Sequence, residues 1–165
     1  RGLAKEELGN DDGALVDLER SNELFPTATA TAALGDIAAK QGTRAKAIEY
    51  YTAVAGNQGE TAVAARDKLI RLDLEDNPGK YIQFGCYADS GQNLIVAIAN
   101  ATNVAIRDVR FVIQYRDDGG MIRNREELIR GPIPAGQRSD LNTRLAPYTS
   151  AIGCPVQITG ARIVN

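Results

Sequence analysis

Few side chains in this chain could do chemistry: it has two cysteines, scattered carboxylates and no histidine among 165 residues. Zinc-protease helices and Ser-His-Asp or Cys-His relays all need an imidazole, which titrates near neutral pH or binds metal. Two thiols alone are too few for a closed zinc site, which usually takes four Cys and His ligands. We therefore expect no catalytic residue, no metal and no cofactor in this chain.

Several carboxylates are adjacent in the sequence. Neighbouring residues point apart on a helix or a strand, so the two members of such a pair do not face one reacting group. We interpret the pairs as solvated faces and helix caps: Glu6-Glu7, Asp11-Asp12, Asp117-Asp118 and Glu126-Glu127.

The two thiols, Cys86 and Cys154, lie near the first and last strands that the sequence predicts. A disulfide between them would close a long loop and stabilise the fold by about 4 kcal/mol in the chain-entropy model. Gly85 and Gly153 precede the cysteines and leave room for a close approach. The bridge would imply an oxidising compartment such as the periplasm. The alternative is a pair of buried free cysteines, which behave as small hydrophobic residues.

Asn100-Ala101-Thr102 fits the short acceptor pattern for N-glycosylation. Matches of three residues are common by chance. We favour a turn in which the Asn and Thr side chains bond backbone groups.

Composition and charge describe a globular chain of two parts. Hydrophobic residues make up 44%, enough for a core. The net charge of -2 argues against a nucleic-acid or polybasic membrane surface. Residues 1–78 carry 9 basic and 14 acidic side chains, whereas residues 79–165 carry 10 and 7. No apolar run approaches the roughly 18 residues that a membrane span needs.

The first half carries helical marks that recur. Gly9 closes a first helix, because a glycine just past a helix end adopts the left-handed conformation. Asp11 or Asp12 is expected to cap the next helix, and Pro26 to end it. The packing positions then repeat at a constant separation in the sequence, equal to the separation of Gly9 and Gly42, which we call the repeat offset. The corresponding positions are Gly9 and Gly42, Ala14 and Ala47, Leu18 and Tyr51, and Ser21 and Val54.

This pattern resembles tetratricopeptide repeats, which are stacked helical hairpins with a period of about 34 residues. Leu34-Gly35 matches the Leu-Gly pair of that repeat's first helix, where glycine lets the two helices approach closely. The resemblance implies an all-α repeat domain over residues 1–76. Residues 59–74 lack the Gly and Pro marks and are expected to form a capping helix, with its charges on the outer face: Arg66, Asp67, Lys68, Arg71 and Asp73.

The period changes after Pro78-Gly79, which breaks any helix. Apolar residues then alternate with polar ones, as in half-buried strands, and Asp117-Asp118-Gly119-Gly120 is a hairpin turn. About six or seven short strands predict an antiparallel β-sandwich over residues 80–165, and hence an α+β chain. The expected strands are 81–87, one with Leu94, Val96 and Ile98 on one face, one with Val109, Phe111, Ile113 and Tyr115 on one face, 121–130, 137–145 and 155–164.

The long strand from Ile106, with Asn100–Asn103 before it and Pro134-Ala135-Gly136 after it, resembles FxLYD-type and related immunoglobulin-like domains of bacterial envelope proteins. With the helical half and the junction 72–82, the chain is similar to the C-terminal accessory region of periplasmic zinc metalloproteases, the β-barrel assembly-enhancing proteases and their relatives. Their catalytic H-E-x-x-H matches nothing here, so no catalytic residue carries over. The chain starts at Arg1 within a repeat, and we expect it to be part of a longer periplasmic or secreted protein.

In the tetratricopeptide family the first helix of each repeat lines a concave groove. We predict that this chain is a non-catalytic interaction and positioning module, which binds a protein or peptide partner or the preceding domain of its own protein, and no nucleic acid. The alternative is a purely structural module that docks on that preceding domain and binds no peptide. By register the groove residues are Leu3, Glu6, Glu7, Ala30, Ala33, Ile37, Lys40 and Gln41.

Overall fold

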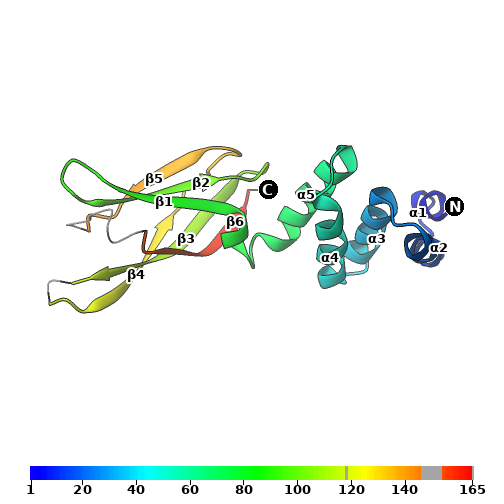
Figure 1. Cartoon of the computed structure of the whole chain (residues 1–165), viewed down its shortest axis with the longest axis horizontal. Helices are drawn as coiled ribbons and strands as arrows, with labels where there is room; N and C mark the ends of the chain where they lie inside the picture. Colours follow the sequence, from blue (N-terminus) through cyan, green and yellow to red (C-terminus); the bar gives the residue numbers. More distant parts are fainter. Residues whose placement is uncertain (118, 146–153, 165) are drawn as a thin grey trace. The chain divides into compact units, whose positions relative to one another are not determined.

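The chain is described from a computed structural model that covers residues 1–117, 119–145 and 154–164. It divides into two compact units, Arg1–Asp73 and Leu74–Asn165. In the described residues the first unit contains helices only, and the second contains one short 3-10 helix and two antiparallel sheets (Figure 1). The α+β architecture predicted from the sequence is confirmed.

The helical unit is built from hairpins of successive helices. Pro26 lies just past the end of the second helix, as its missing N–H requires. The helices are α1 (Gly2–Glu7), α2 (Asp11–Leu24), α3 (Ala28–Lys40), α4 (Arg44–Ala55) and α5 (Glu60–Asp73).

The hairpin α1–α2 and the hairpin α3–α4 turn in the same way, at positions separated by the repeat offset. The amide of Gly9 donates to the carbonyl of Glu6 and that of Asn10 to Lys5, and the amides of Gly42 and Thr43 repeat both bonds with Ala39 and Ala38. Both glycines have a positive φ, 76° and 74°, which glycine adopts at little cost. The internal repeat is therefore present in the backbone as well as in the sequence.

A glycine on the first helix of each hairpin faces a large side chain of the second. A Cβ built on Gly35 would lie 2.6 Å from the Tyr51 ring, and one built on Gly2 would lie 2.7 Å from Cγ of Leu18. Gly2 and Gly35 are again separated by the repeat offset. The repeat thus extends to the contact that sets how closely the two helices pack.

The cap of α2 differs from the expectation. Asn10, and neither Asp11 nor Asp12, is the N-cap, and its side chain accepts a hydrogen bond of 3.0 Å from the amide of Gly13. The two aspartates lie in the first helical turn, where their negative charge interacts favourably with the helix dipole.

Helix α5 buries one face against α3 and α4. Ala62 and Ala65 are almost fully buried, and Leu69 packs beside them. Asp73 follows at the same helical spacing and is 3% exposed, so the prediction that it lies on the outer face is wrong.

The second unit is two three-stranded antiparallel sheets. One has the strand order β1-β2-β5 and the other β4-β3-β6. The elements are the 3-10 helix η1 (Pro78–Lys80) and the strands β1 (Ile82–Ala88), β2 (Leu94–Asn100), β3 (Ile106–Arg116), β4 (Ile122–Ile129), β5 (Arg138–Asn142) and β6 (Val156–Ile163).

Burial along β3 alternates as predicted, but burial along β2 does not. Leu94, Val96 and Ile98 are buried, and so are Ile95 and Ala97 on the opposite face, at 7% and 8% exposure. Strand β2 is central, and the hydroxyl of Tyr87 on β1 reaches over it to donate a 2.7 Å hydrogen bond to Asp140 on β5. This bridge covers the face that the sequence pattern leaves open.

Two long-range links close the sandwich. Cys86 on β1 and Cys154, just before β6, form a disulfide with their Cα atoms 5.1 Å apart. The side-chain nitrogen Nδ2 of Asn100 donates to the backbone carbonyls of Val104, Ile133 and Pro134. The side-chain oxygen Oδ1 accepts from the Thr102 hydroxyl. Asn100 is 1% exposed, so the turn is confirmed and the glycosylation pattern is a chance match.

Candidate functional site: a groove on the helical unit

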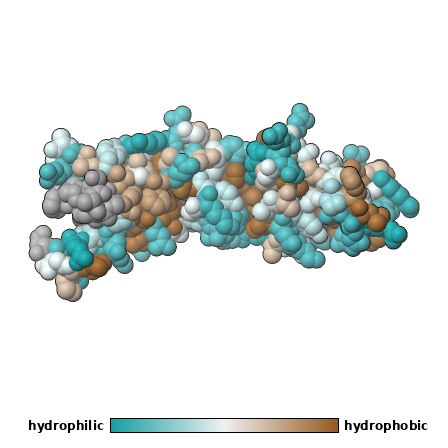
Figure 2. All heavy atoms as spheres, viewed as in Figure 1, coloured by the Kyte–Doolittle hydropathy of each residue, from teal (hydrophilic) through white to brown (hydrophobic). Residues whose placement is uncertain are grey.

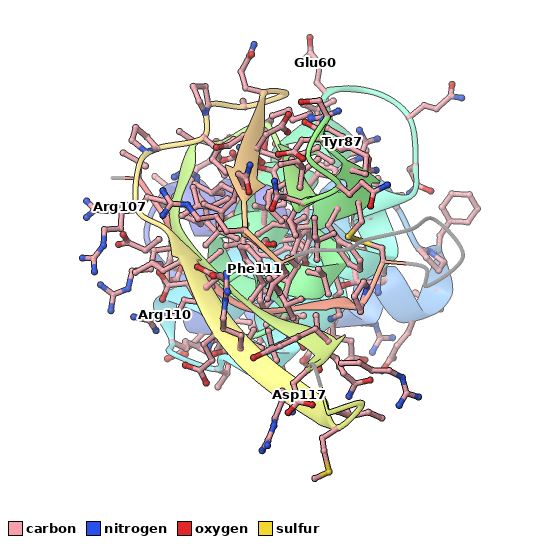
Figure 3. The ribbon with its side chains drawn as sticks, turned by 90° about the vertical axis from the view of Figure 1, so that its left-hand side faces the viewer. Glu60, Tyr87, Arg107, Arg110, Phe111 and Asp117 are labelled. Carbon is pink, nitrogen blue, oxygen red and sulfur yellow. A yellow bond between two sulfur atoms is a disulfide. The ribbon has the colours of Figure 1, made fainter. Side chains whose placement is uncertain are left out.

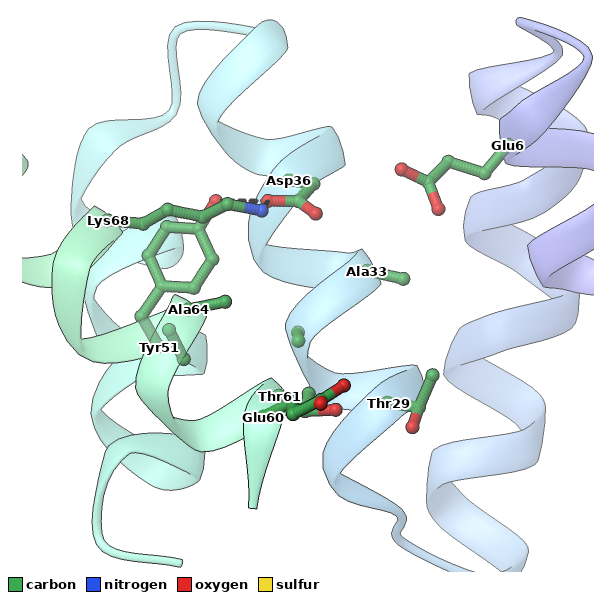
Figure 4. A pocket seen from close by; sticks show the side chains of 11 residues that line it. Glu6, Thr29, Ala33, Asp36, Tyr51, Glu60, Thr61, Ala64 and Lys68 are labelled. Atoms are coloured by element: carbon green, nitrogen blue, oxygen red, sulfur yellow. Dashed lines mark hydrogen bonds and ion pairs between the residues drawn. The ribbon is translucent and has the colours of Figure 1, made fainter. Parts of the chain in front are cut away.

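A hollow in the helical unit lies along the first helices of the hairpins, α1 and α3, together with α5 (Figure 4). Its volume is about 340 Å³. The lining residues are Glu6, Thr29, Ala32, Ala33, Asp36, Tyr51, Glu60, Thr61, Ala64, Ala65 and Lys68. We call this hollow the groove.

Helical spacing explains why these side chains share one surface. On α3 the lining residues Thr29, Ala32, Ala33 and Asp36 lie at i, i+3, i+4 and i+7, which places them on one face. On α5 the same spacing joins Thr61, Ala64, Ala65 and Lys68. The alanines leave the middle of the groove open, and polar side chains lie at its ends (Figure 4).

Asp36 is the polar centre of the groove wall. One of its carboxylate oxygens accepts a hydrogen bond of 2.6 Å from the Tyr51 hydroxyl and another of 2.6 Å from the Lys68 ammonium. The Lys68 nitrogen also lies 5.8 Å from the centre of the Tyr51 ring. These contacts tie α3, α4 and α5 together at the groove.

The hydroxyl of Tyr51 stays neutral at all ordinary pH values. Burial raises the pKa of this phenol, and its hydrogen bond to the Asp36 carboxylate raises that pKa further. Tyr51 therefore acts as a fixed hydrogen-bond donor, and no feature of the groove prepares it for proton transfer.

The predicted groove residues divide into two groups. Glu6 and Ala33 line the groove. Ala33 is 5% exposed and also belongs to the core. Ala30 and Ile37 are buried, at 5% and 0% exposure, and do not line the groove, so they differ from the expectation. The others lie outside the lining: Leu3, Glu7, Lys40 and Gln41 are exposed.

Lys40 makes ion pairs rather than facing a peptide. Its ammonium lies 3.3 Å from Asp11 and 3.8 Å from Glu6. Gln41 is the C-cap of α3. The two residues therefore lie at the end of the helix, beyond the open stretch of the groove.

Sequence reasoning predicted Glu6 but missed the other polar members of the groove. Asp36 and Tyr51 occupy the positions of Leu3 and Leu18 in the first hairpin. Both positions change from apolar to polar in the second hairpin. Such a paired change could have indicated that the two side chains contact each other. Lys68 was assigned only to an outer face.

Neither a metal-binding cluster nor a membrane-spanning helix is present among the described residues. No group of three or more metal-binding side chains lies close enough there to hold an ion. None of the described helices combines the length and apolar character needed to cross a membrane.

Comparison with known proteins identifies no relative. No family model, no curated protein and no solved structure matches this chain. The groove on α1, α3 and α5 is thus the feature on which a function is proposed.

Proposed function

We propose that the helical unit is a tetratricopeptide-type interaction module, which binds a peptide segment of a partner protein in the groove and positions it. The observation that carries this proposal is the open strip of Ala32, Ala33 and Ala64 on the facing surfaces of α3 and α5. Small side chains admit a peptide backbone, and the hydroxyls of Thr29 and Thr61 at the border offer partners for its amides.

The proposal extends to the parent protein. A helical repeat unit followed by an FxLYD or immunoglobulin-like sandwich fits the non-catalytic C-terminal part of a periplasmic zinc metalloprotease. The disulfide between Cys86 and Cys154 supports a periplasmic or secreted location, because such bonds persist in oxidising compartments. The catalytic helix of that parent would lie in a preceding domain, to which this module delivers or orients substrate proteins.

Selection from a random peptide library displayed on phage, with the full chain as bait, tests the groove. We expect selected peptides to lose affinity at least about 10-fold for Ala64→Trp, which fills the groove. The matched control is Val63→Trp, because Val63 is exposed on α5 and outside the groove lining. Lys40→Ala with Gln41→Ala should leave affinity within about 2-fold, since neither residue lines the groove.

Two results would overturn the proposal. One is a library that yields no peptide above background. The other is a set of peptides whose affinities respond equally to Ala64→Trp and Val63→Trp, which would place binding elsewhere on the chain.

One observation favours the structural alternative, in which the unit docks on another domain of its own protein and binds no peptide. Figure 2 shows apolar surface over α1 and α2, where Leu8, Val16, Leu24 and Phe25 are 65–85% exposed. Their counterparts at the repeat offset are polar: Gln41, Glu49, Asn57 and Gln58. Under this alternative no peptide is selected, and Val16→Asp with Leu24→Asp abolishes association with the docking domain.

A further inference from the structure

Three arginines gather on the outer face of the sheet β4-β3-β6. Arg107 and Arg110 belong to β3, and Arg162 belongs to β6. All three are exposed. Figure 3 shows Arg107 and Arg110 projecting from the same side of the sheet, whereas Phe111 lies in the interior. We call Arg107, Arg110 and Arg162 the arginine face.

A β-bulge puts Arg107 and Arg110 on one face. In a regular strand, residues three apart point to opposite faces. Here the register shifts between them, so that Arg107 pairs with Arg162 and Arg110 pairs with Gly160. Asp108 lies at the shift with φ of 51°. This conformation is costly for a residue with a Cβ, and bulges commonly redirect a side chain.

The charges of the arginine face do not serve the sheet itself. Arg107 and Arg162 are direct cross-strand partners, and like charges in that position destabilise a sheet. Arg107 forms an ion pair with Asp108, whose carboxylate lies 3.0 Å from its guanidinium. Over the part of the chain that the structure covers, neither Arg110 nor Arg162 makes an ion pair. Two guanidinium groups therefore remain available to a ligand.

Gly160 keeps the arginine face open. It has no side chain beside Arg110, and the stem of Arg110 lies across it, with Cβ and Cδ 3.7 Å from where a glycine Cβ would be. A larger residue in this position would stand on the outer face and limit access to the guanidinium.

The same face continues along β3 into a polar hollow of about 280 Å³. Its lining includes Val112 and three residues with side-chain amides, Gln114, Asn124 and Gln157. These three residues are exposed. Amide side chains both donate and accept hydrogen bonds, so they can pair with a peptide backbone beside the arginines.

We infer that the arginine face binds a carboxylate-rich peptide segment of a partner protein. Guanidinium groups match carboxylates through paired hydrogen bonds, which an ammonium group cannot form. A long polyanion fits less well, because the chain carries a net charge of -2 and residues 1–78 carry an excess of acidic side chains. This site is on the sandwich and does not depend on the groove of the helical unit.

Fluorescence anisotropy with two labelled peptides tests the inference on the full chain. One peptide has glutamate at every second position, and the other has glutamine at the same places. We expect the glutamate peptide to bind at least about 10-fold more tightly, as two or more charge-assisted hydrogen bonds would give. Arg110→Gln with Arg162→Gln should remove that preference, and Arg110→Lys should retain only part of it.

The matched control is Arg20→Gln with Arg144→Gln, which removes the same charge from exposed positions elsewhere in the chain. The control should bind the glutamate peptide as the wild type does. Thermal unfolding of the Arg110→Gln, Arg162→Gln variant should begin at the same or a higher temperature, because a like-charge pair is removed. Loss of binding in that variant then reports the site and not the fold.

Four results would overturn the inference. They are equal binding of the two peptides, no binding of either, equal losses in the double variant and its control, and tighter binding of a single-stranded DNA oligonucleotide of equal charge than of the glutamate peptide. The last would identify a general polyanion surface.

Discussion

The helical unit and the sandwich are each stabilised internally, by contacts of different kinds. In the helical unit the close contacts join neighbouring helices, such as Gly35 against Tyr51, and they recur at the repeat offset. In the sandwich the decisive links join distant positions: the disulfide spans 68 residues, and Asn100 bonds the carbonyl of Ile133. A single change in the sandwich should therefore weaken the whole unit, whereas one in the helical unit should act on one hairpin.

Loss of the disulfide should have the largest effect. Replacing Cys86 and Cys154 by serine removes a closed loop of 68 residues, and the free energy of unfolding of the sandwich should fall by about 4 kcal/mol. Hydrogen exchange resolved by residue measures each unit separately. Amides of α3 and α4 should keep their protection, and an equal loss there would contradict the proposed difference between the units.

Removal of the donors of Asn100 should be the next largest effect. Asn100→Asp preserves shape and the acceptor for Thr102, but sets a carboxylate against the carbonyls of Val104, Ile133 and Pro134. The unfolding free energy should fall by roughly 3 kcal/mol, because buried carbonyls lose their partners and a buried charge gains none. Chemical denaturation measures this value.

Asn124→Asp is the control for that change, because Asn124 is exposed. It should shift stability by at most about 0.5 kcal/mol. Equal effects of the two substitutions would mean that the Asn100 hydrogen bonds do not hold the sandwich.

Long-range features were partly readable from the sequence. The strands, the pairing of Cys86 with Cys154 and the turn at Asn100 follow from alternation, cysteine count and turn chemistry. The bulge at Asp108 does not, because nothing in the residue type requires a positive φ there. The burial of both faces of β2 also escaped prediction, since it depends on Tyr87 and Asp140 meeting across the sheet.

The sequence predicted the helical repeat, but it assigned the wrong face of α3 to the groove. The recurring glycines and alanines identify α1 and α3 as lining helices, but they do not identify α5, which lacks these marks. They do not fix the face, because α3 has apolar or small residues on nearly every side and one residue turns the helix by about 100°. Ala30 and Ile37 were therefore assigned to the groove, whereas they pack in the core.

Gly35→Ala should have an intermediate effect on stability, and comparison with Gly2→Ala should show how the two hairpins differ. The new Cβ meets the Tyr51 ring, which is buried and held by Asp36, and overpacking of this kind costs about 2 kcal/mol. Gly2→Ala would place a Cβ 2.7 Å from Cγ of Leu18 and 3.2 Å from its backbone nitrogen. Helix α1 has 6 residues and can shift more easily than α3, so the cost should be less than about 1 kcal/mol. Thermal unfolding followed by circular dichroism measures both.

Gly56→Ala is the control for the glycine series. Its φ is -75° and a Cβ there meets nothing within 4 Å, so its stability should be unchanged or slightly higher. If Gly35→Ala behaves in the same way, the close approach of α3 and α4 is not a constraint on that hairpin.

Tyr51→Phe should have a smaller effect than Gly35→Ala, and the effect of Tyr51→Phe should depend on pH. The substitution removes the hydrogen bond to Asp36 but leaves Lys68 as a partner of that carboxylate. Near neutral pH the unfolding free energy should fall by about 1 kcal/mol. The first hairpin has Leu18 and Leu3 at the equivalent positions, so it contains no such bond to lose.

At high pH the difference between the wild type and Tyr51→Phe should shrink. The pKa of Tyr51 is raised in the folded protein by burial and by Asp36, whereas an unfolded tyrosine titrates near pH 10. The unfolded chain therefore loses this proton first, and the stability that Tyr51 contributes is complete below pH 10 and declines above it. The remaining tyrosines are common to both proteins, so subtracting their denaturation curves isolates Tyr51. Parallel stability profiles from pH 8 to 11 would show that the Tyr51 hydroxyl is not buried against a carboxylate.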